Sequence, residues 1–464
     1  MRAFAIRMGL GVLLSGAVTG AWAQVGGFGG FGQASGAMMN VGGMNQTGDT
    51  RFAIRPWAMV NGTYSTILTP PEPGQPANND IYGVIGAYGV GGSKVWQRTS
   101  LGITFSGMHR PSLGQQIRSL SMHTLSLGVS HLVGPRTRVS AAAFAGYGNG
   151  GMGFGAGSMG AGMMMPFGFG SMLQAGQSDF GNPLNNGVVD NDIFDVGTLF
   201  GGATGSLVHQ LSQRWSVGAG GGTFIARRRY RGLNESQGYS GYGMTQYAVT
   251  RTTSLGVQYA EQHFSFRGLF GGNRAQSTSV FLRKSFSPSV AAGVAAGGFR
   301  FTSRFIGQVA IDPALQELLG GFAVGSFEVR EVNRIGAMGT AFVSKSYRRG
   351  FTALAAGRGV TPGNGVLLAA RSDNVSVTSN LSVPGGWALG GMAFYSRLTG
   401  LQQIGLKTQN YMVGGSVSRA LGAGFWAGFS AGYRAVDFPN RPLLRSRFIG
   451  VGITWMPQDA VLVF

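Results

Sequence analysis

One pattern recurs along almost the whole chain: an extended segment in which apolar and small side chains alternate, a short polar turn, and a second alternating segment rich in Gly and Ala. In the segment 423–433, Phe425, Phe429 and Tyr433 share one face, and small or polar residues share the other, with Trp426 as an exception. A membrane-spanning helix needs about 20 apolar residues, which this stretch lacks, whereas a spanning strand needs about 9–11. The pattern therefore predicts strands with one apolar face and one small or polar face.

The alternating unit returns in about eight hairpins, and their turns contain the Pro, Gly, Ser, Lys and Arg that hairpin geometry favours. These hairpins are expected within residues 82–110, 124–148, 198–224, 252–274, 277–300, 336–358, 374–397 and 416–434. The segments 54–68 and 445–457 remain unpaired at the two ends, and pairing them with each other closes the sheet. The expected fold class is all-β: a transmembrane antiparallel up-and-down β-barrel of about eighteen strands, with about sixteen as the alternative count.

The N-terminus has the three parts of a secretory signal peptide. Arg2 and Arg7 precede a short apolar run, and Ala21 and Ala23 form a small-residue cleavage site. We expect residues 1–23 to be removed by cleavage before Gln24. The formal net charge of the full chain is +20, which predicts an anionic binding partner. Because the chain is expected to be exported, we expect this partner to be a phosphate-bearing lipid or an anionic solute and not nucleic acid.

The remaining segments complete the expected organisation. A Gly/Met/Asn-rich flexible periplasmic arm is expected over residues 24–50, the barrel over 51–456, and a C-terminal tail over 457–464. Short turns lie on one side and longer connections on the other, which places both chain ends in the periplasm. The longest connection, 149–195, is an external loop. Residues 302–333 are expected to form another external loop, in which a short helix begins at Asp312 with Pro313 at its first position.

The signal peptide, the alternation, the hairpins and the even strand count resemble Gram-negative outer-membrane β-barrels of porin type, without a family-specific motif. The resemblance implies an outer-membrane location and insertion by the barrel-assembly machinery. It further implies passive diffusion of small solutes, anionic solutes among them. It also implies that loop 149–195 folds into the lumen; a disordered external loop is the alternative. Either Trp455 or Phe464 supplies the terminal aromatic that such barrels use for assembly. The oligomeric state is not predicted.

Arginines at the external ends of the strands are the candidate pore-lining or rim residues: Arg110, Arg228, Arg300, Arg358, Arg397 and Arg434. Alternation places Arg110 and Arg434 on the lumen face, and Arg228 and Arg300 fit less cleanly. A ring of arginines raises the local anion concentration at a pore mouth. The same side chains could bind phosphates of outer-membrane lipid, including lipopolysaccharide, or be ordinary rim charge. The small residues on the polar face favour an open lumen.

No enzymatic signature accompanies the histidines or the scattered acids, so an enzyme, a cofactor and a metal site are not expected. Methionines in loop 149–195 could bind a soft metal, but methionine is also a flexible gap filler. Two functions of other kinds remain open: a non-conducting structural or surface-interaction barrel, and an export pore for an envelope polymer.

Overall fold

The computed structural model describes residues 53–66, 80–111, 120–149, 197–228, 235–267, 271–309, 326–363, 368–402, 406–437, 443–457 and 462–463. All regular elements in these ranges are strands: β1 (Ala53–Thr66), β2 (Asp80–Val95), β3 (Thr99–Arg110), β4 (Leu120–Gly134), β5 (Thr137–Asn149), β6 (Thr198–Gln210), β7 (Trp215–Arg228), β8 (Ser236–Ala248), β9 (Thr253–Phe266), β10 (Asn273–Ser287), β11 (Val290–Val309), β12 (Ser326–Tyr347), β13 (Gly350–Gly363), β14 (Leu368–Val383), β15 (Trp387–Gly400), β16 (Lys407–Gly422), β17 (Phe425–Asp437), β18 (Leu444–Trp455) and β19 (Leu462–Val463). No helix in the described ranges is long and apolar enough to cross a membrane.

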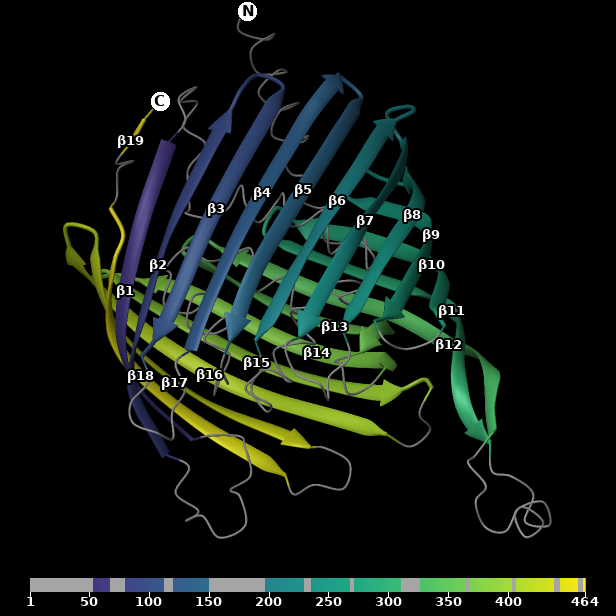
Figure 1. Ribbon diagram of the computed structural model, residues 1–464. Coiled ribbons are helices and arrows are strands. Elements are labelled where there is room, and N and C mark those ends of the chain that lie inside the picture. The colour runs from purple at the N-terminus through teal and green to yellow at the C-terminus, as the bar shows by residue number, and fades with distance from the viewer. Residues whose placement is uncertain are drawn as a thin grey trace, which may run out of the picture.

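The strands form a closed ring (Figure 1). Each strand from β1 to β18 pairs antiparallel with its neighbours in sequence, and β18 returns to β1 in a register running from Ala58↔Trp455 to Ser65↔Phe448. The predicted all-β barrel of about eighteen strands is therefore confirmed, including its closure by the first and last strands. Beyond β18, the two residues of β19 pair with Ala53 and Ile54 at the start of β1.

The two ends of the ring differ in their connections. Short turns of two to four residues join the strands of each hairpin at one end, which we call the turn end: 96–98, 135–136, 211–214, 249–252, 288–289, 348–349, 384–386 and 423–424. The longer connections lie at the opposite, loop end. The signal peptide, the arm 24–50, most of loop 149–195 and the helix expected at Asp312 lie outside the described residues.

Two predicted boundaries were wrong. The hairpin expected within 252–274 is instead β8–β9, with its turn at 249–252, because β8 is rich in Ser, Gly, Tyr and Gln and lacks an aliphatic alternation. The predicted number of strands is still right, because the two errors cancel. The segment 252–274 was predicted to hold two strands but contains only one whole strand, β9, and the missed strand β8 makes up the difference. The region 302–333, expected to be a loop, continues as strand to Val309 on β11 and from Ser326 on β12.

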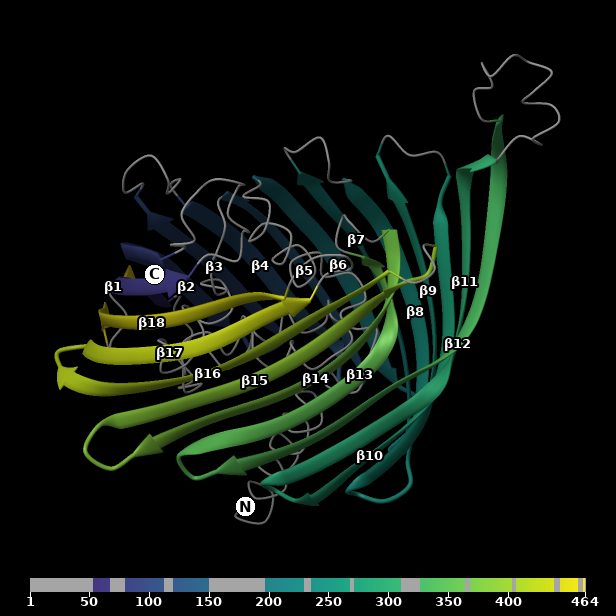
Figure 2. The same ribbon diagram turned by 90° about the horizontal axis from the view of Figure 1, so that it is seen from below.

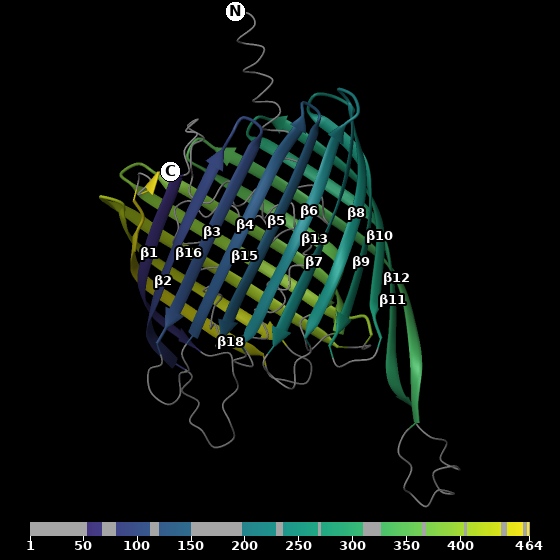
Figure 3. The same cartoon turned by 45° about the horizontal axis from the view of Figure 1, so that its top comes forward.

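The β11–β12 hairpin is longer than its surroundings. The two strands pair from Val290↔Lys345 to Val309↔Ser326, whereas β12 pairs with β13 only from Gly339 to Tyr347. β11 stays paired with β10 as far as Ser303, so only the tip of the hairpin beyond Ser303 and Val332 leaves the wall and projects past the loop end (Figures 2 and 3).

Alternation gives every strand an outer and an inner face. On β18, Ile449, Val451 and Ile453 are exposed on the outer face, while Ser446 and Phe448 are buried on the inner face. The outer face is dominated by exposed aliphatic side chains of this kind. It is therefore the apolar face predicted from the sequence.

The inner face was predicted to carry mostly small or polar residues, but it also carries large aromatic side chains. Large side chains including Phe200, Phe224, Phe264, Phe281 and Phe301 are buried there. Many of these rings lie directly opposite a glycine on the neighbouring strand. The pairs are Phe144↔Gly202, Phe200↔Gly146, Phe224↔Gly238, Phe281↔Gly256, Phe299↔Gly336 and Phe342↔Gly293. Glycine leaves room for the ring to lie across the backbone, which explains part of the high glycine content.

Candidate functional site: the inner wall and the loop-end rim

The structure divides the predicted arginines into two groups. Arg110 and Arg434 lie on the inner face and are only 5% and 2% exposed. Arg300, Arg358 and Arg397 alternate instead with the outward-facing side chains of β11, β13 and β15, so they lie on the outer side of the loop end. Arg228 ends β7, where it pairs with Thr198, and its side chain is outside the described part of the chain.

The inner face carries further arginines that the sequence analysis did not identify, because it assigned faces only to arginines at the loop ends of the strands. Arg55 on β1, Arg138 on β5 and Arg283 on β10 share the inner face with buried neighbours such as Trp57, Ala142 and Phe281. The signal that could have found them is the same period of two, extended to the turn end of each strand. Their positions place positive charge at both ends of the lumen.

Where the described strands are paired on both sides, no carboxylate lies on the inner face; Glu328 has inner-face parity on β12, but it lies on the projecting tip of the β11–β12 hairpin. Glu261, Asp373 and Asp437 all alternate with outward-facing residues, and Glu331 lies on the projecting hairpin. Arg434 is oriented by Asn410 on β16, because its Nε donates to Asn410 Oδ1 at 3.1 Å. The wall that surrounds the lumen therefore combines arginines with neutral side chains.

An apolar cluster lines the inner wall near the loop end. It contains Phe224, Ala260, Phe264, Phe266, Ala275, Phe299, Phe301, Met338, Val360 and Ala369. The rings of Phe264 and Phe301 stack with centroids 6.3 Å apart, and those of Phe264 and Phe266 meet edge to face at 6.0 Å. Val360 on β13 and Ala369 on β14 are almost completely buried against this cluster.

A polar contact joins distant parts of the wall beside that cluster. Gln402, just after β15, donates through its Nε2 to Asn273 Oδ1 at 2.7 Å, and it also bonds Ser303. Asn273 and Ser303 are buried inner-face residues of β10 and β11, several strands away from β15 around the ring. The loop end of β13–β15 therefore folds inward and narrows the lumen on this side.

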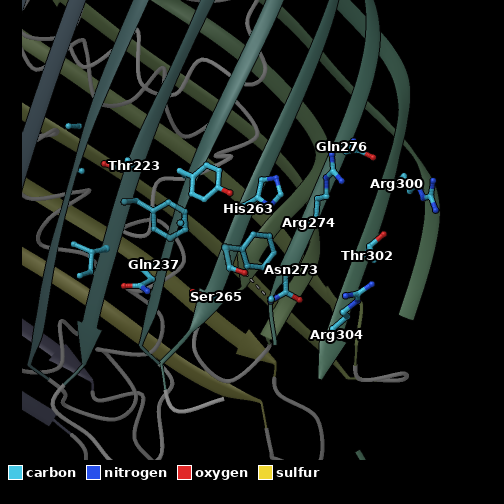
Figure 4. A pocket seen from close by; sticks show the side chains of 18 of the residues that line it. Thr223, Gln237, His263, Ser265, Asn273, Arg274, Gln276, Arg300, Thr302 and Arg304 are labelled. Carbon is cyan, nitrogen blue, oxygen red and sulfur yellow. Dashed lines mark hydrogen bonds between the residues drawn. The ribbon is translucent and has the colours of Figure 1, made fainter. Parts of the chain in front are cut away.

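The outer side of the loop end holds a network of charged and polar groups. Glu261 accepts hydrogen bonds from Arg274 Nε at 2.7 Å and from Tyr259 Oη at 3.0 Å, and it lies 2.6 Å from His263 Nε2. Arg304 Nε donates to Glu331 Oε2 at 3.0 Å. Of these residues, His263, Arg274, Arg304 and Glu331 border a shallow cavity of about 1100 Å³ (Figure 4).

A second outer network follows on β13–β15. Arg358 Nε bonds Asp373 Oδ1 at 2.5 Å, and Arg371 Nε lies 3.6 Å from the other oxygen of the same carboxylate. Arg397 lies opposite Asp373 in the strand register. In both networks arginine side chains lie beside carboxylates, so the outer loop-end rim is mixed in sign.

The described residues contain no group of three or more His, Cys, Asp or Glu side chains that could hold a metal ion. The His263–Glu261 pair faces outward and is shared with Arg274, so it forms part of an ion-pair network. The prediction that the chain is not an enzyme remains a prediction.

No protein-family model matches the chain, and no curated protein matches it. Among solved structures, the open form of the ferric-catecholate import receptor Fiu from E. coli K12 shares 7% identity, covering 88% of this chain and 81% of that chain with a TM-score of 0.40. The FrpB iron transporter from Neisseria meningitidis (F3-3 variant) shares 8% identity, covering 90% and 83%, with a TM-score of 0.39. Pseudomonas aeruginosa OccK2 (OpdF) in complex with glucuronate shares 10% identity, covering 87% and 98%, with a TM-score of 0.41. Because these TM-scores are below 0.5, the fold assignment rests on the strand pairing of the chain itself.

Proposed function

We propose that this chain is an outer-membrane barrel that lets small solutes diffuse passively and that favours anions. The observation that carries the proposal is the inner face, which carries Arg55, Arg110, Arg138, Arg283 and Arg434; the one described carboxylate with inner-face parity, Glu328, lies on the projecting tip of the β11–β12 hairpin, away from the lumen wall. Fixed positive charge along a narrow path raises the local concentration of anions and disfavours cations. The export signal over residues 1–23 and cleavage before Gln24 belong to the same proposal.

The outer face supports the membrane location. On β10, one face carries Arg274 at the loop end, then Gln276, Thr278 and the exposed Val280 and Leu282, and Lys284 at the turn end. At about 3.3 Å per residue, the two charged residues are about 33 Å apart along the strand. A strand tilt of about 40° reduces this to about 25 Å of height, which is the height of the apolar band of outer-membrane barrels.

Ion selectivity in planar lipid bilayers tests the function. We expect a steady current and a reversal potential in a salt gradient that shows anion preference. Arg434→Gln and Arg110→Gln remove inner-face charge, so they should move the anion-to-cation permeability ratio toward one. Arg300→Gln removes the same charge from the outer side and is the matched control. A cation-selective current, or an equal effect of Arg300→Gln, contradicts the proposal.

The second candidate function is a non-conducting structural barrel. The inward fold at Gln402 and the apolar inner cluster favour it, because both narrow the lumen. A folded, bilayer-inserted protein that carries no current would support this candidate. Heat-modifiability on a mild detergent gel confirms folding in either case.

A further inference from the structure

The charged side chains at the turn end are all basic, within the turns and adjoining strand ends that the structure describes. They are Arg55, Lys94, Arg98, Arg136, Arg138, Arg214, Arg251, Arg283, Lys284, Lys345, Arg348, Arg349 and Arg419. The described carboxylates lie instead in the loop-side half of the chain's strands or beyond them: Asp80, Glu235, Glu261, Glu328, Glu331, Asp373 and Asp437. The two ends of the barrel therefore differ in charge, and the turn end presents one sign to its surroundings.

Three lysines at this end share one local arrangement. The sequence Lys-x-aromatic leads into a turn at Lys94–Trp96, at Lys284–Phe286 and at Lys345–Tyr347. In each case the lysine Nζ lies over the ring of the aromatic residue, at 5.2, 5.1 and 5.2 Å from its centroid.

Two further sites continue the same belt. The guanidinium of Arg419 on β16 lies 5.2 Å from the ring centroid of Trp387, which is the directly opposite residue on the neighbouring strand β15. Arg214 Nη1 donates to Tyr247 Oη at 3.3 Å, and the Tyr247 ring lies 4.9 Å from that of Trp215. We call these basic and aromatic residues the turn-end belt.

The belt faces outward, toward lipid in the proposed membrane setting. Lys284 and Phe286 continue the face of the exposed Val280 and Leu282, and Lys345 continues the face of the exposed Val343. Trp96, Trp215, Phe286, Tyr347 and Trp387 are themselves exposed. Aromatic side chains at the edge of an apolar band lie at the level of lipid headgroups.

The position of each lysine relative to its ring sets the height of the charge. Lys94, Lys284 and Lys345 precede their aromatic partners by two residues, so each Cα lies closer to the apolar band than the ring does. Because each Nζ lies over the ring, the side chain runs toward the turn end and carries its charge out of the band. The ammonium groups then lie at headgroup level.

We propose that the turn-end belt binds the phosphate groups of anionic glycerophospholipids in the leaflet that faces the turn end. Charge complementarity favours this occupant, because a uniformly basic belt attracts anionic headgroups. The aliphatic residues next to each lysine favour a lipid over free phosphate, because acyl chains can cover them. This inference rests on the proposed membrane location, and it is independent of conduction.

Native mass spectrometry of the full-length protein in detergent tests the proposal, with phosphatidylglycerol and phosphatidylcholine as competing probes. The wild type should retain several-fold more phosphatidylglycerol than phosphatidylcholine. The variant with Lys94→Gln, Lys284→Gln and Lys345→Gln should lose this preference, and the same three positions changed to Arg should keep it. The matched control changes Lys407→Gln, Arg445→Gln and Arg447→Gln at the outer loop end and should retain it.

Three results would overturn the inference: no lipid preference in the wild type, an equal loss in the loop-end control, or competition by millimolar inorganic phosphate as effective as that of the lipid. Failure of the membrane proposal gives a different result. In that case neither the wild type nor any variant inserts into neutral vesicles, and none shows a heat-dependent shift on a mild detergent gel. If the Gln variant does not fold, the salt dependence of phosphatidylglycerol retention by the wild type decides the matter. Retention should fall as salt rises, and a salt-independent preference would contradict a charge-based site.

Discussion

At the residue scale, glycine acts here through the space that it leaves. The ring of Phe299 on β11 lies across Gly336 on β12, and a Cβ at Gly336 would lie 2.6 Å from Cζ of that ring. Aromatic side chains bury large areas and prefer such close cross-strand partners. The glycines opposite aromatic rings are thus packing positions of the inner wall.

Gly336→Ala should destabilise the folded barrel by about 1–3 kcal/mol, because the ring of Phe299 must leave its position and the adjoining apolar cluster must repack. The urea midpoint of unfolding from detergent micelles measures this. Gly391→Ala on β15 is the control, since a Cβ there would meet nothing within 4 Å. Equal midpoints for the two variants would contradict the packing role.

At the element scale, the hairpin β16–β17 is closed by two residues that both have positive φ. Ala423 has φ of 49° and Gly424 has φ of 79°. This is the requirement of a type I′ turn, whose twist matches that of the flanking strands and which favours Asn-Gly. Ala423 is the unfavourable residue of the pair, because its Cβ crowds the backbone in this conformation.

Ala423→Asn and Ala423→Gly should each stabilise the barrel by about 0.5–1 kcal/mol, because Asn and Gly tolerate the left-handed conformation better than Ala does. The same urea titration measures the shift. Gly424→Ala should have the opposite sign, because it adds a Cβ at positive φ and crowds the carbonyl oxygen of Met456. A destabilised Ala423→Asn variant would show that the turn has a different geometry.

At the scale of the whole molecule, the ring is not a uniform cylinder. The loop ends of β13–β15 fold inward against β10 and β11, while the tip of the β11–β12 hairpin, beyond Ser303 and Val332, leaves the wall (Figure 2). The two features belong together, because β12 loses its pairing with β13 where β13 turns toward the inner cluster at Val360. The narrowing is therefore a property of the wall itself.

Gln402→Ala removes the bonds to Asn273 and Ser303, so the inward-folded loop end should become less constrained. We expect a higher single-channel conductance with unchanged ion selectivity, since the inner arginines remain. Gln213→Ala, in an exposed turn at the opposite end, is the control. Unchanged conductance in Gln402→Ala would mean that this contact does not limit the path.

The sequence by itself determined the fold class, the even strand count and the closure of β1 on β18, because strand faces follow from a period of two and an unpaired edge has to find a partner. It missed β8, whose polar and glycine residues carry no alternation, and it placed the outer half of the β11–β12 hairpin in a loop. Arg110 and Arg434 were assigned to the inner face from period alone. The outward positions of Arg300, Arg358 and Arg397 follow the same period of two, whereas the inward fold at Gln402 and the end of β12–β13 pairing at Gly339 depend on register and wall curvature. Both arise from contacts between strands far apart in sequence, so only the tertiary structure could decide them.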